Sequence, residues 1–445
     1  MGSGTLVSLL PGDFIGGNVL IVGADGVDKG LLDAVIKKAG KLTIIENERT
    51  AAILDEIRKN TNCDVDCIKM EQVIGVDYSL VLCNGMLDME LSSKFLSWLL
   101  PDCYVMLVTH CDKVDESAVD NPDKPTTYSL ESVFKTTPSK NSYGFVFVAS
   151  RIIETYEDHR VLYSSMFKKV LLGPEQDRRL DSLHDVLNDK TYTKKISTFF
   201  ERVFSRGGDP GYISTGGAEV TEECMRRLDL QPGQRVLDVG CGAGGPAILH
   251  AKKYKAHVVG VDISSNMIDL ATEVTANYPD LNIEFEVCDI ERREFPEGYF
   301  DAIYSKDVIL HIVRKQELFK KFLKWLKPGG KLLITDYCRT TNDFSDMMEA
   351  YMKKRANVWF LLTVPVYGQL LKDSGFVNVD AQDKHAVLCE SNKQENIHLA
   401  NKRHDLLKEF DQQFVDDWTD VWKNKVKIIG NKDLTWGVFY AEKCQ

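Results

Sequence analysis

Short apolar runs that have the length of buried strands recur along the chain. The runs 19–22, 42–45, 236–239 and 258–261 are rich in Val, Leu and Ile. Longer segments of mixed polarity separate them and leave room for covering helices. Apolar strands that alternate with helices are typical of a parallel sheet covered on both faces. The pattern therefore predicts an α/β fold of the doubly wound, Rossmann-like type.

The apolar runs of the first half return in the second half in the same order. VLIVGADG (19–26) is echoed by VLDVGCGA (236–243), and LTIIE (42–46) by VVGVD (258–262). SWLLPDCYVMLVTHC (97–111) matches KWLKPGGKLLITDYC (324–338), and YGFVFVAS (143–150) matches WGVFYAEK (436–443). Such an internal repeat predicts two related units in tandem. We expect one at 1–175, a polar linker at 176–190 and the other at 191–445.

The segment VLDVGCGAGG (236–245) carries the strongest chemical signal. Glycines at alternate positions after a strand let backbone N–H groups approach a bound nucleotide. Gly240, Gly242 and Gly245 would equally fit a dinucleotide-binding loop, so NAD stays an alternative. Asp238 favours S-adenosylmethionine (SAM), because a carboxylate at the strand tip attracts the amine of SAM and repels a pyrophosphate.

Two further acids end the strands that follow. Asp262 lies 24 positions after Asp238, the usual offset for binding ribose hydroxyls, and Asp289 can accept a hydrogen bond from the adenine amino group. Three strand-tip acids in register favour SAM over NAD. The sequence thus predicts that the second unit has the class I SAM-methyltransferase fold.

The first unit differs from the second at these positions. Ile21 stands where the second unit has Asp238, and Asp25 stands where it has Gly242. An aliphatic side chain cannot hold an amine, and an aspartate crowds the place where backbone meets ligand. The first unit also lacks most of the segment that would form a substrate lid, at about 339–430 in the second. We expect a degenerate, non-catalytic first unit.

Asp307 and His311 are the candidates for acid-base chemistry. They follow the strand 300–305 and are four positions apart, so a helical turn would place them on one face, where the carboxylate can orient the imidazole. The aligned residues of the first unit are Asn84 and Asp88, so the pair is absent there. Tyr337 ends a neighbouring strand, where its hydroxyl would emerge at the same edge of the sheet.

Composition narrows the partners and the compartment. A net charge of −11 argues against nucleic acid as the main partner, because such binding needs a basic surface. The eleven cysteines are irregularly spaced and form no cluster with metal-ligand spacing, so we expect reduced thiols and no metal. No signal peptide and no membrane-spanning run is evident, and the cytoplasm is expected. The sequence does not predict the oligomeric state, and a monomer is slightly favoured.

Six blocks of the second half together resemble the phosphoethanolamine (phosphobase) N-methyltransferases, SAM enzymes that build phosphocholine. The blocks are YTKKIS (192–197), GYISTGG (211–217), VLDVGCGAGG (236–245), YSKDVILHI (304–312), LLITDYC (332–338) and WGVFYAEK (436–443). A degenerate first copy with an intact second copy resembles the nematode-type enzyme that performs the later methylations.

The resemblance implies roles for individual residues. Asp307 and His311 would be the catalytic pair, with Tyr192 closing over the site. The substrate phosphate would be held by Tyr337, Arg355 and Lys425, and the tyrosine that the family has just after the arginine is replaced here by Asn357 or Trp359. The residues expected to line the SAM pocket are Ile213, Ser214, Asp238, Gly240, Gly242, Asp262, Ile263, Asp289, Ile290 and Ser305.

The implied reaction is N-methylation of phosphomonomethylethanolamine and phosphodimethylethanolamine to phosphocholine, which feeds phosphatidylcholine synthesis. SAM would be the methyl donor and S-adenosylhomocysteine the product, and the partner would be a small phosphorylated amine. One alternative is a SAM methyltransferase acting on another small polar amine or a carboxylate. An NAD-dependent oxidoreductase is the weaker alternative.

Overall fold

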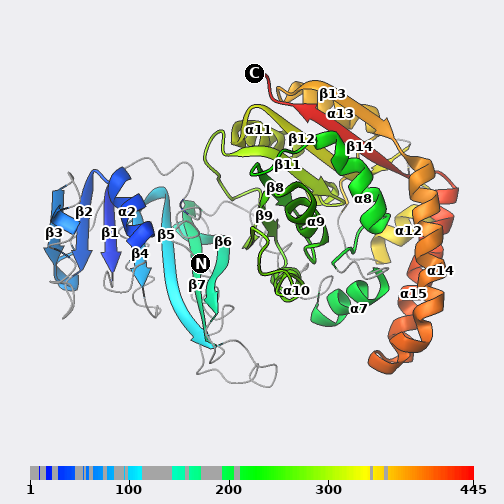
Figure 1. Cartoon of the computed structure of the whole chain (residues 1–445), viewed down its shortest axis with the longest axis horizontal. Coiled ribbons are helices and arrows are strands. Elements are labelled where there is room, and N and C mark those ends of the chain that lie inside the picture. The colour runs from blue at the N-terminus through cyan, green and yellow to red at the C-terminus, as the bar shows by residue number, and fades with distance from the viewer. Residues whose placement is uncertain are drawn as a thin grey trace. The chain divides into compact units, whose positions relative to one another are not determined.

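The computed structural model describes most of the second half of the chain and parts of the first (Figure 1). The described residues are 10, 17–22, 29–45, 54, 57–59, 64–73, 78–84, 95, 99–112, 143–155, 160–171, 193–204, 211–340, 344–354 and 359–445. The chain divides into two compact units. One comprises residues 1–181 with 292–295, and the other comprises residues 182–291 with 296–445.

The second unit is built on a sheet in the order β13-β14-β12-β11-β8-β9-β10. Its strands are parallel except for β14, which runs antiparallel to both of its neighbours. The carboxyl ends of β8 to β12 therefore meet at one edge, where ligands of open α/β sheets bind. The strands are β8 (Arg235–Val239), β9 (His257–Asp262), β10 (Ile283–Cys288), β11 (Phe300–Lys306), β12 (Leu326–Arg339), β13 (Val377–Asp383) and β14 (Leu434–Glu442).

The first unit repeats this strand order as β6-β7-β5-β4-β1-β2-β3, with β7 as its antiparallel strand. The tandem arrangement of two class I methyltransferase-type sheets is thus confirmed. The strands are β1 (Asn18–Val22), β2 (Lys41–Ile45), β3 (Asp64–Ile68), β4 (Tyr78–Asn84), β5 (Leu99–Asp112), β6 (Tyr143–Thr155) and β7 (Arg160–Leu171), and the helices are α2 (Lys29–Lys38) and the 3-10 turn η2 (Met70–Gln72).

Two of the predicted correspondences between the units are wrong in detail. Residues 143–150 belong to β6, the edge strand, so the counterpart of β14 is β7 and not β6. The strand registers also align Asn84 with Lys306 rather than with Asp307, because Ile21 faces Leu82 as Asp238 faces Tyr304. The shift by one leaves the conclusion intact, since residue 85 of the sequence is a glycine.

The connection before the antiparallel strand differs most between the units. Residues 156–159 join β6 to β7, whereas residues 384–433 join β13 to β14 and form the long helices α14 (His385–Glu409) and α15 (Gln412–Gly430). Part of the predicted lid at 339–430 belongs to the sheet instead, because β13 is its edge strand and α13 (Val364–Asp373) packs on β13.

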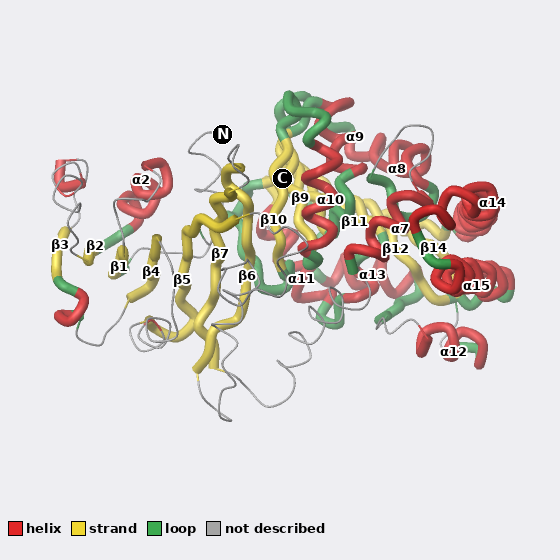
Figure 2. Tube along the Cα trace, turned by 90° about the horizontal axis from the view of Figure 1, so that it is seen from below, coloured by secondary structure: helices red, strands yellow, loops and turns green. Residues whose placement is uncertain are grey.

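The remaining helices of the second unit flank its sheet and this helical pair (Figure 2). A cluster of aromatic side chains joins α7 to α14 and α15, with Phe199 making edge contacts to Phe410 and Phe414. The helices are α7 (Lys194–Phe204), α8 (Gly217–Met225), η5 (Arg226–Leu228), α9 (Gly245–Tyr254), α10 (Ser265–Thr275), η6 (Ile309–His311), α11 (Lys315–Trp325) and α12 (Asp346–Lys354).

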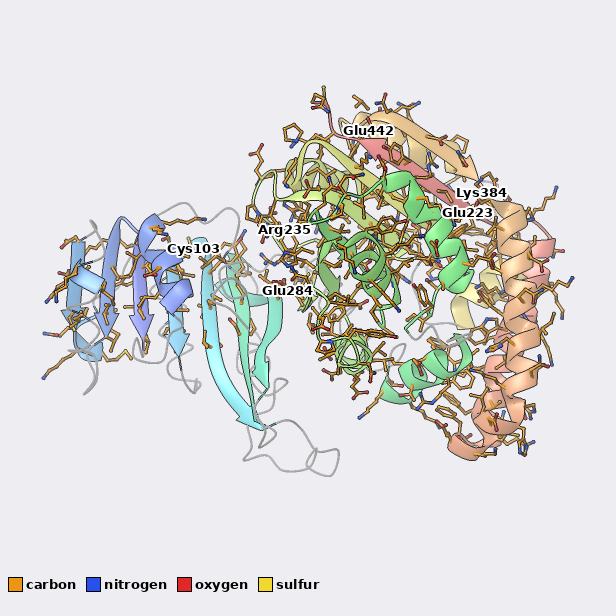
Figure 3. All side chains as sticks on the ribbon, viewed as in Figure 1. Cys103, Glu223, Arg235, Glu284, Lys384 and Glu442 are labelled. Atoms are coloured by element: carbon orange, nitrogen blue, oxygen red, sulfur yellow. The ribbon has the colours of Figure 1, made fainter. Side chains whose placement is uncertain are left out.

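Side-chain hydrogen bonds fasten the edge of this sheet. Glu442, labelled on β14 in Figure 3, accepts hydrogen bonds from Asn378 at 2.7 Å and Tyr440 at 2.5 Å. Among the helices described, none combines the length and the apolar character that crossing a bilayer requires.

Candidate active site

The glycine loop after β8 has a backbone that side chains would obstruct. Gly240 has φ +70°, and a Cβ there would lie 2.1 Å from the side chain of Val308. Gly242 and Gly244 also have positive φ, and α9 begins directly afterwards at Gly245. The loop therefore presents bare backbone at the N-terminus of a helix, as a nucleotide-binding loop requires.

Asp238 is a buried acid at the end of β8. It is 1% exposed, and its Oδ2 atom has no hydrogen-bond partner within the protein. Burial, with a contribution from the nearby Asp262, raises the pKa of this carboxyl to about 8. A buried carboxyl oxygen without a donor is costly. An ammonium group such as that of SAM would supply the missing donor and charge, so the residues present fit this cofactor.

The other two strand-tip acids are held by backbone donors. Asp262 accepts from Gly242 N at 3.0 Å and from Ser264 N at 2.9 Å, and burial raises its pKa to about 6. Asp289 accepts from Glu291 N at 2.9 Å. These contacts fix the two carboxylates at the carboxyl ends of β9 and β10, and Asp262 also contacts the glycine loop.

The isoleucines and serines of the predicted SAM pocket differ in how deeply they are buried. Ile213 lies against Gly242, Ile290 is buried, and Ser214 and Ile263 are half-buried. Ser305 is fully buried, and its hydroxyl donates to Val239 O at 2.9 Å. The structure thus gives Ser305 a role in joining β11 to β8.

Asp307 does not lie in a helical turn with His311, as the spacing suggested. It precedes η6 and has φ +57°, a left-handed conformation that is uncommon for a residue with a side chain. Its Oδ1 accepts from Trp436 Nε1 at 2.7 Å, and its Oδ2 accepts from Thr215 N at 3.0 Å. The carboxylate is therefore oriented by these two donors, while His311 ends the short η6 helix.

Strand pairing explains how Trp436 reaches Asp307. Trp436 on β14 is the register partner of Tyr337 on β12, and Asp307 N donates to Thr335 O of β12 at 2.8 Å. The indole therefore crosses β12 toward the end of β11. Neither Trp436 nor Thr215 was predicted, although both lie inside the blocks WGVFYAEK and GYISTGG that carried the resemblance.

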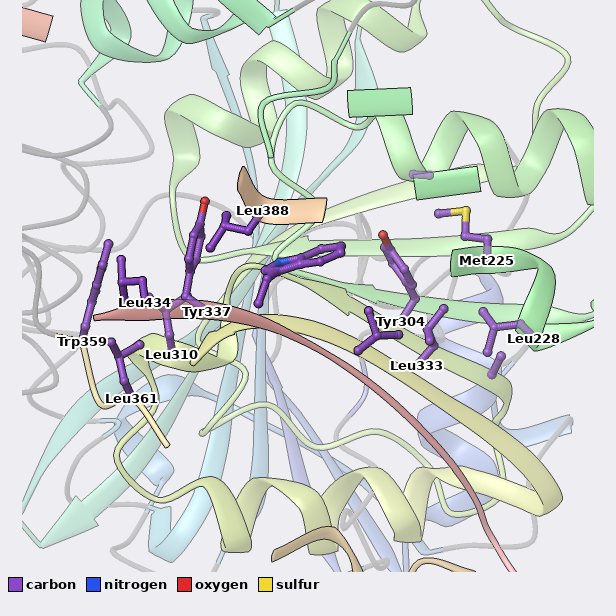
Figure 4. Close-up of a cluster of buried hydrophobic side chains, with 14 of the residues drawn as sticks. Met225, Leu228, Tyr304, Leu310, Leu333, Tyr337, Trp359, Leu361, Leu388 and Leu434 are labelled. Atoms are coloured by element: carbon purple, nitrogen blue, oxygen red, sulfur yellow. The ribbon is translucent and has the colours of Figure 1, made fainter. Parts of the chain in front are cut away.

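Three of the predicted phosphate ligands come together in the structure. Lys425 on α15 donates to the Tyr337 hydroxyl at 2.7 Å, and the Trp359 ring stacks on the Tyr337 ring at 5.7 Å and 11° (Figure 4). The hydroxyl of Tyr337 also shares a hydrogen bond with Thr215 Oγ1 at 2.7 Å. Arg355, Asn357 and Tyr192 lie outside the described residues.

A buried acid accompanies Lys425. Glu395 Oε2 lies 4.0 Å from Lys425 Nζ and accepts from Trp422 Nε1 at 3.2 Å and from Asn392 Nδ2 at 3.2 Å. Although burial opposes the charged form, Tyr337 and Glu395 raise the pKa of Lys425 above its usual value. Lys425 is thus a buried cation with one partly separated counter-ion, a suitable partner for an anion.

The first unit lacks the cofactor acid in space as well as in sequence. Ile21 is fully buried in β1 and pairs with Ile44 of β2, as Asp238 in β8 pairs with Gly260 of β9. An apolar side chain therefore occupies the place of the amine-binding carboxyl.

Comparison with known proteins agrees with the site. The family model for a methyltransferase domain, Methyltransf_31, matches residues 230–427. Phosphoethanolamine N-methyltransferase 1 of Arabidopsis thaliana is 34% identical over 365 residues, which cover 79% of this chain and 72% of that protein. Phosphoethanolamine N-methyltransferase of Plasmodium falciparum is 37% identical over 268 residues, which cover 59% of this chain and 97% of that protein.

A solved structure shares the fold of the whole chain. Phosphoethanolamine N-methyltransferase 2 of Haemonchus contortus, in complex with phosphomonomethylethanolamine and S-adenosylhomocysteine, superposes with a TM-score of 0.72 at 22% identity, covering 96% of this chain and 94% of that one. The sequence relatives and the orphaned Asp238 agree with each other and leave no place for the NAD alternative. The chain belongs to the phosphoethanolamine N-methyltransferases and is a SAM-dependent methyltransferase of phosphobases.

Proposed function

We propose that the second unit transfers methyl groups to phosphomonomethylethanolamine and phosphodimethylethanolamine and so forms phosphocholine. The observation that carries the proposal is the hydrogen-bonded series Lys425, Tyr337, Thr215 and Asp307, which joins a buried cation to the predicted catalytic acid. A phosphobase carries a phosphate at one end and an amine at the other. Lys425 would bind the phosphate, and Asp307 would lie near the amine. The solved Haemonchus relative with phosphomonomethylethanolamine supports this substrate class.

Different residues of the chain would bind the cofactor, anchor the substrate and remove its proton. SAM supplies the methyl group on a positively charged sulfur. Asp238 would hold the amine of SAM, and Tyr337 and Lys425 would anchor the substrate phosphate through charge-assisted hydrogen bonds. An alkylammonium group is protonated at neutral pH and cannot attack. His311 would remove that proton while the Asp307 carboxylate attracts the ammonium, and anchoring both ends supplies the alignment.

We further propose that the enzyme acts in the cytoplasm and that the first unit does not methylate. The nine cysteines whose side chains the structure describes are free thiols, which supports a reducing compartment. Ile21 in the place of Asp238 supports the inactive first unit.

Transfer of radiolabelled methyl from SAM to each phosphobase tests the function. The wild-type chain should label both acceptors, and His311→Ala should lower kcat about 100- to 10,000-fold, the usual contribution of a general base. His404→Ala on the exposed side of α14 is the matched control and should keep full activity. Labelling of neither acceptor by the wild-type chain would refute the proposal.

A further inference from the structure

Thr215 contacts both ends of the proposed site with different atoms. Its backbone N donates to Asp307 Oδ2 at 3.0 Å, and its side-chain Oγ1 hydrogen-bonds Tyr337 OH at 2.7 Å. It is 2% exposed and directly follows Ser214, a predicted SAM contact. One residue thus links the catalytic acid, the phosphate ligands and the cofactor side of the site.

The hydrogen bonds of the Tyr337 hydroxyl determine whether Thr215 donates or accepts. An ammonium group only donates, so the Tyr337 oxygen accepts from Lys425. Burial raises the pKa of Tyr337 to about 12, so the phenol keeps its single proton at neutral pH. A phosphate dianion only accepts. When phosphate accepts the hydrogen bond of the phenol O–H, the hydroxyl of Thr215 must therefore be the donor to the remaining lone pair of the Tyr337 oxygen.

Hydrogen bonds from Thr221 and Lys306 hold the end of the turn that carries Thr215. Thr221 Oγ1 on α8 donates to Gly217 O at 2.6 Å, and the buried Lys306 donates to Thr221 Oγ1 at 2.6 Å. Lys306 directly precedes Asp307 in the chain. The turn and the acid are therefore both linked to the end of β11.

We propose that Thr215 is a positioning residue whose hydroxyl directs the Tyr337 proton to the substrate phosphate while its backbone N–H holds Asp307. The inference rests on the proposed function, because it assigns Tyr337 to the phosphate. Thr215 itself does not touch the reacting atoms, and its hydroxyl acts through Tyr337 alone.

Thr215→Val and Thr215→Ser separate the hydroxyl from the backbone contact. Valine keeps the shape and the N–H but removes the hydroxyl, so the KM for phosphomonomethylethanolamine should rise about tenfold while kcat changes by less than about threefold. Serine should return KM to within about threefold of the wild-type value. The affinity for S-adenosylhomocysteine, measured by calorimetry, should be unchanged in both. Thr272→Val on the exposed face of α10 is the control and should alter neither constant.

A second measurement keeps the test decisive. In a Tyr337→Phe background, Thr215→Val should raise KM no further, because its partner is already gone. Thr215→Ala gives the same hydroxyl-free comparison if the valine variant does not fold. An unchanged KM in a folded Thr215→Val variant, or equal losses in valine and serine variants, would overturn the inference.

A wild-type chain that methylates no phosphobase would instead refute the proposed function. Calorimetry with inorganic phosphate would then decide the inference: a tenfold weaker affinity in Thr215→Val supports it, and an unchanged affinity overturns it.

Discussion

At the scale of single residues, the site rests on carboxylates whose surroundings differ sharply. Asp307 has a donor on each oxygen, whereas Asp238 has an oxygen with none. The first is held in a fixed orientation by its two donors before any ligand binds. The second is poised to become an anion when a cation arrives. Each difference leads to a measurable prediction.

Binding of S-adenosylhomocysteine should release a proton from Asp238. A carboxyl whose pKa is about 8 in the folded protein is mostly protonated at pH 7, whereas the amine of the ligand favours the ionised form. Calorimetry at pH 7 in buffers of different ionisation enthalpy should therefore show nearly one proton released. The affinity should rise with pH up to about 8 and then level off.

Asp238→Asn is the matching variant. It should bind S-adenosylhomocysteine more weakly by about 1.5–3 kcal/mol, the value of a hydrogen bond to a charged group, and should release no proton. The raised pKa also has a consequence for the ligand-free protein. The contribution of Asp238 to the free energy of unfolding is greatest at low pH. It falls as pH rises from about 4 through 8, because the unfolded chain loses the proton at lower pH than the folded protein does. The asparagine variant should therefore be the more stable protein at pH 8. Equal proton release by both proteins would contradict the assignment.

Asp307→Asn should damage catalysis more than the loss of one charge suggests. Both partners of Asp307 are donors, and an amide offers only one acceptor, so its NH₂ group must face Thr215 N or Trp436 Nε1. We expect kcat to fall at least 100-fold. Asp301→Asn is the control, because Asp301 at the other end of β11 also accepts from two donors, Arg235 N and Lys327 Nζ. It should lower only the melting temperature, and a comparable loss of kcat there would contradict the prediction.

At the scale of elements, the loop between β8 and α9 depends on glycines, and Gly240 has the closest neighbour among them. Gly240→Ala places a methyl group 2.1 Å from Val308 and forces a left-handed alanine. Overpacking and backbone strain together should lower the free energy of unfolding by about 2–5 kcal/mol. The displaced loop should also weaken S-adenosylhomocysteine binding, measured by calorimetry.

Gly298→Ala isolates the backbone part of that effect. Gly298 has a similar φ of +61°, but a Cβ there meets nothing within 4 Å. We expect a loss of only about 1–2 kcal/mol and unchanged ligand binding. Equal effects at the two glycines would show that strain, and not the contact with Val308, governs the loop.

The sequence predicted the strands and the glycine loop well, because both depend on local patterns. Apolar runs mark buried strands, and alternate glycines mark the turn. It misassigned residues 143–150, because β6 and β14 have similar aromatic and β-branched runs, and composition does not distinguish an edge strand from the strand beside it.

The contacts of Asp307 were beyond local patterns. Thr215 and Trp436 are 92 and 129 positions away along the chain, and only the strand order brings them to the same place. The expected helical turn with His311 was wrong because Asp307 ends the strand in a left-handed conformation before η6 begins. Tyr337, Trp359 and Lys425 were brought together as the resemblance implied, although spacing alone could not have joined them.

At the scale of the whole molecule, the two units share one topology but differ in what the topology carries. Residues 156–159, which join β6 to β7 in the first unit, are too few to form helices like α14 and α15, and Lys425 lies on α15. The first unit also has Ile21 in place of Asp238. Both differences support our proposal that the first unit does not methylate.

Separate expression of the units tests this division. Residues 182–445 should fold, bind S-adenosylhomocysteine and methylate phosphobases, and residues 1–181 should do neither of the last two. Circular dichroism of both fragments is the control for folding. Methyl transfer by the first fragment, or a folded second fragment without activity, would contradict the division.

The position of Trp436 in the chain also determines when Asp307 gains its indole donor during synthesis. β11 and β12 leave the ribosome well before β14, since residues 340–433 must be translated in between. At ~5–20 residues per second this delay is about 5–20 s. Throughout it the Asp307 carboxylate lacks its indole donor. A nascent polypeptide therefore completes the donor set of this carboxylate only when translation reaches the antiparallel strand.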